Sequence, residues 1–396
     1  MTLHRLLRKQ LPLLFILAAA VSIANADDAR IFTEGRSDGG ELKYVNDLPV
    51  LIVSGTPKEI GRQRAALTAE AAKTLVAYPQ KWLERAGYKE LLPELVEMAK
   101  NLSPQLSDDH RAELQAFAER SGVDRNLVVL GNSLIDIRGN FGCSSLIVDA
   151  ARSKTGGPLF GRNLDFATLG VLDKYGLVTV YRPKGKHAFA AVGFPGVAGC
   201  VSGMNDAGLA LAVHEIHYSA DGSKQYNAKG VPCLFLFRQA LEECTTIEEV
   251  EKLLARNSRT TFFSLALCDR NGGAVLEVTP KMIFLRRGEN GICACTNHFR
   301  CKGLMVSDKS SRYAKLMESK KIERLDKSDV AQKLHEVNLG KKTVQTMLFE
   351  PVTLRLHLAM GKCPSSGEKM KTLDLKPLFE AAKLSGEFTK LGPSSR

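Results

Sequence analysis

The spacing of apolar and polar residues divides the chain into a helical part followed by blocks of strand. After a polar, glycine-containing lead-in at 27–48, the apolar run at 50–53 predicts a short strand. From about Pro49 to Arg138, apolar residues recur mostly at helical spacing. We expect helices in three places, at 57–78, 91–102 and 108–121.

Beyond Gly139, short apolar runs typical of strands dominate. We expect strands at 145–148, 177–181, 189–192, 209–213 and 354–359, and a second block between 261 and 297 with a hairpin turn at 270–273. Helices are expected at 231–243, 246–256, 310–319 and 328–337. Two blocks of strands flanked by helices favour an α+β fold, in which stacked antiparallel sheets lie between helical layers.

The first 26 residues have the layout of a secretory signal peptide. Arg5, Arg8 and Lys9 precede an apolar run at 11–23, and small residues at 24–26 offer a cleavage site. The apolar run is short for a membrane span, and no long apolar run follows it. We therefore expect export to the periplasm or the extracellular space, without stable membrane insertion.

Composition and charge add little beyond this. The 396 residues are 44% hydrophobic and 25% charged, which is ordinary for a globular protein. The formal net charge is +12, and it falls by three when the basic residues of the leader are removed. This excess mildly favours a carboxylate-bearing ligand. No motif for nucleic-acid recognition is present, so no nucleic-acid partner is expected.

The chain has nine cysteines, and an odd number leaves at least one unpaired within the chain. Cys244 and Cys268 stand in apolar stretches and are expected to be buried. Cys293 and Cys295 are two residues apart and are expected on one face of a strand. Neither their spacing nor the neighbouring residues indicate a metal site.

Another cysteine stands at the sharpest boundary of the chain, where the helical part ends. Four further motifs follow it in order. The set is Gly142-Cys143-Ser144, Gly161-Arg162-Asn163-Leu164-Asp165, Gly203-Met204-Asn205, Thr296-Asn297-His298 and Ser311-Arg312. Together with phrases at 54–61 and 193–196, this series resembles the penicillin acyltransferase-like family. That family is named for acyl-CoA:6-aminopenicillanic acid acyltransferase and is related to the choloylglycine hydrolases and acid ceramidases.

The resemblance covers most of the chain and implies an αββα N-terminal-nucleophile fold made as a self-cleaving precursor. The implied cleavage lies between Gly142 and Cys143, and the signal peptide expected from the N-terminal layout spans 1–26. The cleavage would separate a mainly helical proregion, 27–142, from a catalytic domain, 143–396, and the two chains are expected to stay associated. No cofactor and no metal ion are expected.

The resemblance also implies roles for single residues. Cys143 matches the nucleophile, and Gly142 and Cys143 flank the bond that is cut. Arg162 and Asp165 match residues that surround the thiol and the new amine. Asn205 and Asn297 match asparagines that help form the oxyanion site. Arg312 matches an arginine that supports the centre.

The chemistry of these residue types agrees with such a mechanism. A thiol of pKa about 8.5 needs a base or positive surroundings to react as a thiolate. A free α-amine, of pKa about 7.7–8.0, is a suitable base, but Cys143 has none until the preceding peptide bond is cut. Glycine at 142 restricts the backbone little during that attack. The expected reaction is hydrolysis of a linear amide that is not a protein peptide bond, such as an N-acyl amino acid or N-acyl amine.

Several alternatives stay open at this point. The enzyme could pass an acyl group from a thioester to an amine. A conventional cysteine enzyme could use His214 or His298 as its base. The chain could be a secreted binding protein on the same fold, without catalysis. His214 and Glu215 could contact a substrate. The remaining candidates could also be structural, as an ion pair, a turn, a strand cap or a surface residue: Arg162, Asp165, Asn205, Asn297 and Arg312.

Overall fold

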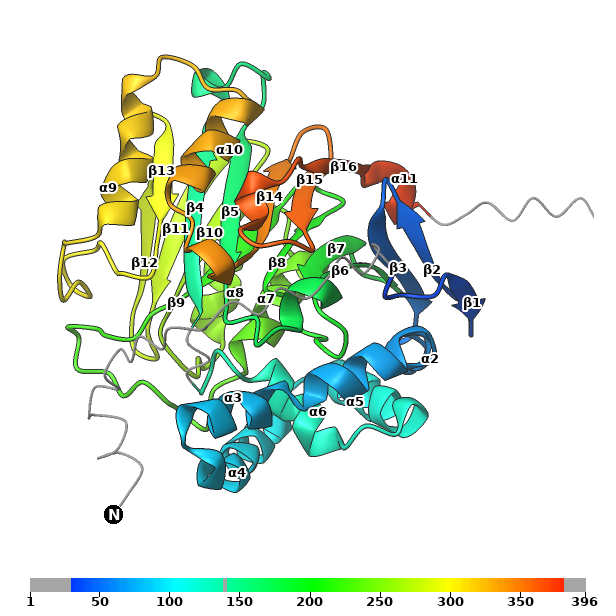
Figure 1. Cartoon of the computed structure of the whole chain (residues 1–396). Helices are drawn as coiled ribbons and strands as arrows, with labels where there is room; N and C mark the ends of the chain where they lie inside the picture. The colour runs from blue at the N-terminus through cyan, green and yellow to red at the C-terminus, as the bar shows by residue number, and fades with distance from the viewer. Residues whose placement is uncertain (1–29, 138–140, 381–396) are drawn as a thin grey trace, which may run out of the picture. The chain divides into compact units, whose positions relative to one another are not determined.

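Two β-sheets lie face to face in the computed structural model, between layers of helices (Figure 1). The structure describes residues 30–137 and 141–380, and from Phe32 onward they belong to one compact unit. The expected signal peptide at 1–26 lies outside the described residues.

The larger sheet has ten strands within the described residues, in the order β1-β2-β3-β6-β7-β8-β9-β10-β11-β12. Their bounds are Gly35–Ser37, Gly40–Val45, Leu48–Gly55, Leu177–Pro183, Phe189–Gly193, Ser202–Asn205, Ala210–Glu215, Phe263–Asp269, Gly272–Val278 and Ile283–Arg287. Neighbouring strands run antiparallel, except that β3 and β6 are parallel. The segment before Cys143 thus supplies β1–β3 to a sheet whose other strands follow Cys143.

The smaller sheet has six strands in the described part of the chain, ordered β13-β4-β5-β14-β15-β16, and all its neighbours are antiparallel. The bounds are Gly142–Val148 for β4, Leu159–Asp165 for β5, Ile292–Cys295 for β13, Thr343–Glu350 for β14, Arg355–Met360 for β15 and Lys371–Asp374 for β16. Cys143 stands near the start of β4, which lies between β13 and β5.

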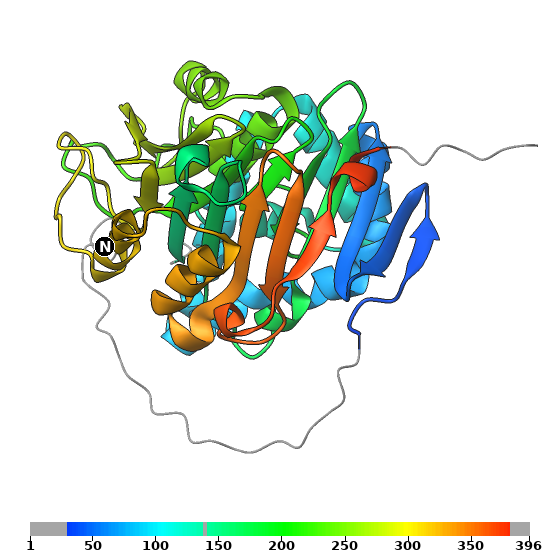
Figure 2. The ribbon, with the colours of Figure 1, turned by 90° about the horizontal axis from the view of Figure 1, so that it is seen from above.

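Helices cover the outer sides. Before Cys143 come α2 to α6, with bounds Pro57–Val76, Tyr78–Ala86, Leu92–Leu102, Asp108–Ser121 and Arg125–Asn132. α7 and α8, at Cys233–Glu243 and Ile247–Arg256, pack on the outer face of the larger sheet. α9 and α10, at Ser311–Met317 and Lys327–Glu336, pack on the smaller sheet, and the short α11 is Lys376–Phe379. Figure 2 shows the smaller sheet's orange and red strands over the green strands of the larger one.

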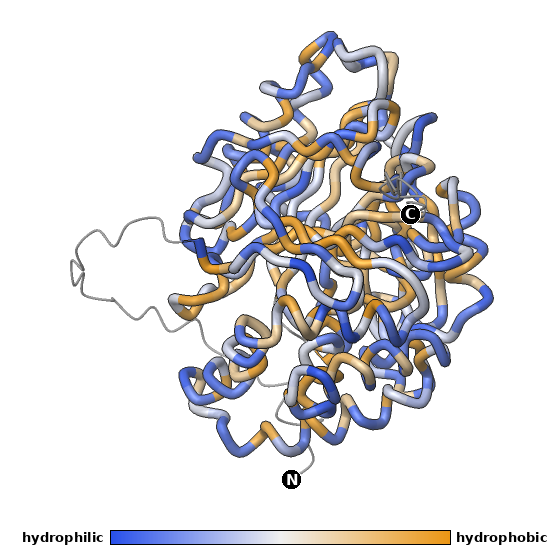
Figure 3. Tube along the Cα trace, turned by 90° about the vertical axis from the view of Figure 1, so that its right-hand side faces the viewer, coloured by the Kyte–Doolittle hydropathy of each residue, from blue (hydrophilic) through white to orange (hydrophobic). Residues whose placement is uncertain are grey.

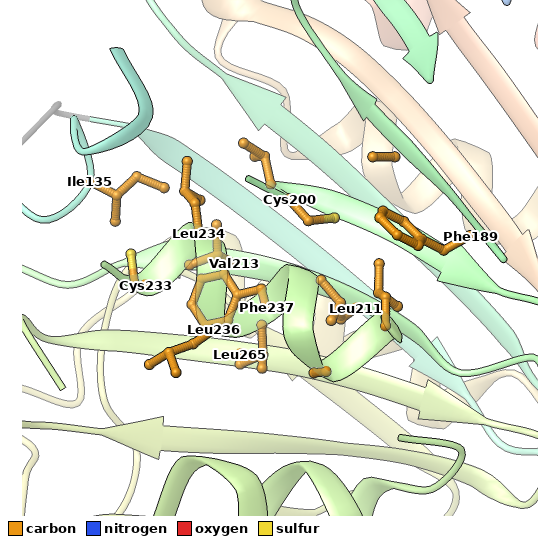
Figure 4. Close-up of a cluster of buried hydrophobic side chains, with 14 of the residues drawn as sticks. Ile135, Phe189, Cys200, Leu211, Val213, Cys233, Leu234, Leu236, Phe237 and Leu265 are labelled. Carbon is orange, nitrogen blue, oxygen red and sulfur yellow. The ribbon is translucent and has the colours of Figure 1, made fainter. Parts of the chain in front are cut away.

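Side chains alternate along the strands between the inter-sheet core and the outer layers. On β3, Val50 and Ile52 belong to the inter-sheet core, while Leu51 and Val53 belong to the cluster that the helices cover. Figure 3 shows apolar segments concentrated along the strands, whereas the helices alternate between apolar and polar residues. Figure 4 shows the outer cluster, where α7 packs its apolar face on the larger sheet.

The cysteines lie largely in these cores. Cys293 and Cys295 both belong to the inter-sheet core, and Cys244 and Cys268 are buried, as their sequence context predicts. All nine cysteines lie within the described residues, and each is a free thiol in the structure.

The three helices expected before residue 122 are confirmed, and so are the two after residue 230. The polar lead-in at 27–48, for which the sequence predicted no strand or helix, contains β1 and β2. Both strands are partly exposed at the edge of the sheet and therefore lack an apolar run. The region 27–142 is consequently not only helical. Within the described residues, no helix combines the length and apolarity that a bilayer crossing requires.

Candidate active site

Cys143 lies at the end of the smaller sheet and is 1% exposed. In the structure the chain runs on from Gly142 through Cys143 into β4. Burial raises the pKa of the Cys143 thiol above its usual value, although the charges of Arg162 and Arg312 oppose this. Asp165 adds to the increase. The thiol of the intact chain is therefore neutral near pH 7.

Asn297 and Arg312 hold the backbone on both sides of Gly142. The Cys143 N–H donates to Asn297 Oδ1 at 2.8 Å, and Asn297 Nδ2 donates to the Phe141 carbonyl at 3.1 Å. Arg312 Nη1 donates to the Cys143 carbonyl at 2.5 Å, and its Nη2 donates to Asn297 Oδ1 at 2.9 Å. One asparagine thus binds both neighbours of Gly142, and one arginine holds that asparagine in place.

Asp165 lies directly across from Gly142 in the β4–β5 register. A methyl group at position 142 would approach the Asp165 Cβ to 3.0 Å and Leu339 Cδ1 to 2.8 Å, so glycine permits this close packing. Thr343 donates its hydroxyl to Asp165 Oδ1, while Asp165 Oδ2 lies 4.0 Å from Arg312 Nη1. Burial raises the pKa of Asp165, although Thr343 and Arg312 oppose that increase.

Arg162 is fully buried on β5, directly opposite Ser145. Its Nη1 donates to the Val213 carbonyl at 2.8 Å, which ties the smaller sheet to β9 of the larger one. Its Nε and Nη2 have no hydrogen-bond partner among the described residues. A buried guanidinium with two uncommitted donors strongly favours an anion formed beside it.

The structure does not bring Asn205 to this cluster. Asn205 ends β8, and its Nδ2 donates to the carbonyls of Leu241 at 3.0 Å and Cys244 at 2.7 Å. Its Oδ1 accepts the N–H of Leu209 at 2.9 Å. Because both amide hydrogens are committed at the end of α7, the expected role of Asn205 as an oxyanion donor does not fit this geometry.

Glu215 contacts the backbone next to Gly142, whereas the sequence suggested it only as a possible substrate contact. It ends β9 and is 1% exposed. Its Oε2 accepts the Phe141 N–H at 2.6 Å, and its carbonyl accepts from Asn297 Nδ2 at 2.9 Å. The available signal was a carboxylate directly after an apolar strand, because glutamate is rarely buried without a partner.

An apolar cavity of about 80 Å³ adjoins these residues. Phe141 and Phe166 line it, and their rings stack with centroids 3.9 Å apart. Most of the other lining residues come from α2, α3, α5 and α6 and from the loop at 194–201, and α7 adds Leu234. Since Phe141 precedes Gly142 and Phe166 follows Asp165, the cavity begins beside the polar cluster.

A profile of the acyl-coenzyme A:6-aminopenicillanic acid acyl-transferase family matches residues 152–362, which is more than half of the chain. The chain belongs to this family. The resemblance stated from the ordered motifs is thereby confirmed. The match includes the positions of Arg162, Asp165, Asn297 and Arg312 but begins after Cys143.

Another protein is similar to the chain at low identity. An uncharacterised protein of Archaeoglobus fulgidus is 23% identical over 283 residues, which are 63% of this chain and 46% of that protein. This chain therefore spans about half the length of that relative.

Two solved structures resemble the chain, both with TM-scores below 0.5. The N-acylethanolamine-hydrolyzing acid amidase ortholog of Caenorhabditis elegans has a TM-score of 0.42 and 16% identity, covering 53% of this chain and 93% of that chain. A variant of the conjugated bile acid hydrolase of Clostridium perfringens has a TM-score of 0.43 and 14% identity, covering 59% and 93%.

Two histidines of this acyl-transferase family member were candidates for a catalytic base. His214 is buried on β9, where burial and the charge of Arg162 lower its pKa well below the usual value. Burial and the charge of Arg312 also lower the pKa of His298. Both ring nitrogens of His214 and Nδ1 of His298 have no hydrogen-bond partner among the described residues, whereas a cysteine–histidine pair requires a bond from the ring to the thiol. No group of three or more metal-ligating side chains there is arranged to hold a metal ion.

Proposed function

We propose that the protein is a self-processing cysteine N-terminal-nucleophile enzyme that acts on linear amides. The observation that carries the proposal is a pair of hydrogen bonds on the two sides of Gly142, by which Asn297 binds both Phe141 and Cys143. These bonds hold the scissile segment in place relative to the Cys143 side chain, and a fixed geometry makes an intramolecular attack effective.

The cut begins when the Cys143 thiol adds to the Gly142 carbonyl. The C–N bond to Cys143 then breaks, the nitrogen takes up the proton, and Gly142 is held as a thioester on sulfur. Water hydrolyses this thioester, which leaves a carboxylate on Gly142 and a free α-amine and thiol on Cys143. Arg162 favours the thiolate in this attack, since two of its donors have no other partner among the described residues.

The cut also releases an oxyanion donor. Before cleavage, Asn297 Nδ2 donates to the Phe141 and Glu215 carbonyls. Departure of the new Gly142 terminus would weaken the bond to Phe141 and free an N–H of Asn297 for a substrate oxygen. Donors aimed at a developing oxyanion are typically a large catalytic term. Asp165, across from Gly142, orients the new ammonium group.

In the amidase reaction the Cys143 sulfur attacks the acyl carbonyl while the α-amine takes the proton of the thiol. The amine then returns that proton to the leaving nitrogen, and water hydrolyses the acyl-enzyme. The apolar cavity beside Phe141 supports an apolar acyl group, so the proposed substrates are N-acyl amino acids or N-acyl amines. Transfer of an acyl group from a thioester to an amine is the second candidate, favoured by the activity that names the family.

The test is the mass and N-terminal sequence of the purified protein. Wild type is expected as two chains that begin at Asp27 and Cys143, which also reports the proposed export and signal cleavage. Cys143→Ala is expected to stay uncut, because alanine cannot form the thioester. Cys268→Ala is the matched control, since Cys268 is equally buried but lies in the inter-sheet core away from Gly142.

Two results would contradict the proposal. Cleavage of Cys143→Ala at the same bond would mean that the thiol does not perform the cut. An intact wild-type chain with no turnover of any acyl amide would favour a binding protein on the same fold.

A further inference from the structure

Four charged side chains are buried where the N-terminal helices meet α7. Arg64 of α2 pairs with Glu113 of α5 at 2.8 Å, and Glu113 pairs with Arg238 of α7 at 2.6 Å. Arg238 also pairs with Glu242 at 2.8 Å. The side chains of this ion cluster are each 1–3% exposed. Although burial alone would raise it, Arg238 and Arg64 hold the pKa of Glu113 below its usual value.

The same two arginines hold the loop at 194–201. Arg64 Nη2 donates to the Val197 carbonyl at 2.8 Å, and Arg238 Nη1 donates to the Ala198 carbonyl at 3.0 Å. Each guanidinium therefore joins Glu113 to a carbonyl of the loop. A planar fork with fixed donors can do this, whereas the single ammonium of lysine cannot make both bonds in one fixed plane.

Asn132, at the end of α6, binds the same loop from another side. Its Oδ1 accepts the N–H groups of Ala198 at 2.7 Å and Gly199 at 3.0 Å. Its Nδ2 donates to the Gly196 carbonyl at 2.9 Å. Four consecutive residues of the loop are thus bound by three buried side chains, two of which precede Cys143 in the chain.

This loop is a wall of the apolar cavity. Gly196 and Val197 line the cavity, and so does Phe117, whose ring lies 5.1 Å from the Arg64 guanidinium carbon. A shift of Arg64 would therefore move both the loop and an aromatic wall. Buried, paired charges resist such a shift, because separating them leaves an uncompensated charge in a low-dielectric interior.

We propose that Arg64, Glu113, Arg238 and Asn132 are positioning residues that set the shape of the apolar cavity and with it the preferred length of the acyl chain. This rests on the proposed function, in which that cavity holds the acyl group. Three of the four residues belong to the segment before Cys143. After the cut, acyl-chain selection is consequently a property of both chains together.

The test measures binding of saturated fatty acids of increasing length, by displacement of a fluorescent fatty acid from the intact, processed protein. Arg64→Lys keeps a charge beside Glu113 but gives up the second bond, to Val197. We expect this variant to bind the preferred fatty acid about tenfold more weakly and to shift the preferred chain length by about two methylene groups. With N-acyl substrates, KM is expected to rise for the preferred chain while kcat for the shortest chain is unchanged.

Arg259→Lys is the matched control. Arg259 is also a buried arginine, but it donates to the backbone carbonyls of Leu254, Asn257, Thr279 and Pro280, away from the cavity. It is expected to keep the wild-type chain-length profile.

Glu113→Gln serves as a second variant and is expected to broaden the profile; if it does not accumulate as folded protein, Arg64→Lys decides the question. An unchanged profile in folded Arg64→Lys would overturn the proposal, even where that variant melts earlier. If wild type binds none of the fatty acids, the acyl role of the cavity fails, and the positioning role falls with it. Normal fatty-acid binding by an uncut or inactive protein would instead contradict only the catalytic part of the proposed function.

Discussion

Asp136 lies buried a few residues before the proposed cut, with one oxygen bonded and one not. Its Oδ1 accepts the N–H of Cys233 at 2.9 Å and the hydroxyl of Thr260. Its Oδ2 has no hydrogen-bond partner among the described residues. Burial raises the pKa of Asp136 to about 6, against the hydrogen bonds that lower it. Folding therefore disfavours the charged form of Asp136 relative to the unfolded chain.

This shift predicts a pH-dependent effect of Asp136→Asn on stability. Below about pH 4 the carboxyl is protonated in both states. Between about pH 4 and pH 6 the unfolded chain loses the proton while the folded chain keeps it, so the wild type loses stability as pH rises. Asparagine does not titrate, so the variant does not lose this free energy of unfolding. A shift of about two pKa units corresponds to about 3 kcal/mol. Denaturant unfolding at pH 4 and pH 7.5 measures it, and an equal difference between variant and wild type at both values would contradict it.

At the scale of elements, Asn205 joins the β8–β9 turn to the end of α7. Asn205→Ala leaves the Leu209 N–H and the carbonyls of Leu241 and Cys244 without these partners. We expect it to lower the free energy of unfolding by about 2–5 kcal/mol. The Gly142–Cys143 bond is expected to be cut at the wild-type rate in protein that folds. Normal thermal stability combined with loss of the cut or of turnover would instead return Asn205 to the active site.

Two of the strands that the sequence did not predict, β5 and β14, were missed for the same physical reason. β5 carries Arg162, Asn163 and Asp165, and β14 carries Thr343, Gln345 and Thr346. All six side chains are buried. Their polar groups bond across the two strands, as Thr346 does to Asn163. The pattern of apolar residues does not reveal a strand whose buried positions are polar. β3 and β6 were predictable because most of their buried residues are apolar.

The residues of the candidate active site were also only partly predictable from the sequence. The ordered motifs named Cys143, Arg162, Asp165, Asn297 and Arg312, which the structure gathers at one end of the smaller sheet. They did not predict the bond from Phe141 to Glu215, because that contact joins positions 74 residues apart. Phe141 lies just before β4 of the smaller sheet, and Glu215 ends β9 of the larger one. They also placed Asn205 in the cluster, since a motif gives a residue's identity but not the direction of its side chain.

For the molecule as a whole, the two chains left by the cut would share one β-sheet. β3 pairs with β6 in parallel from Val50–Val178 to Gly55–Pro183, and both lie inside the sheet (Figure 1). The buried ion cluster crosses the same boundary. Loss of the N-terminal chain would expose the edge of β6, and an exposed edge strand promotes aggregation. We therefore expect the two chains to behave as one folding unit after the proposed cut.

We predict that the processed chains co-elute in gel filtration even in 1 M NaCl, because buried pairs are screened far less than exposed ones. Thermal unfolding is expected as one cooperative transition, with the chains separating only in denaturant. Residues 143–396 expressed alone are expected to aggregate, and co-expression with 27–142 is expected to restore soluble protein. Separate elution of the two chains in native buffer, or a soluble and active 143–396, would mean that the strands before Cys143 are dispensable. The larger sheet would then have to be stable without β1–β3, and β6, which is a central strand here, would become its edge.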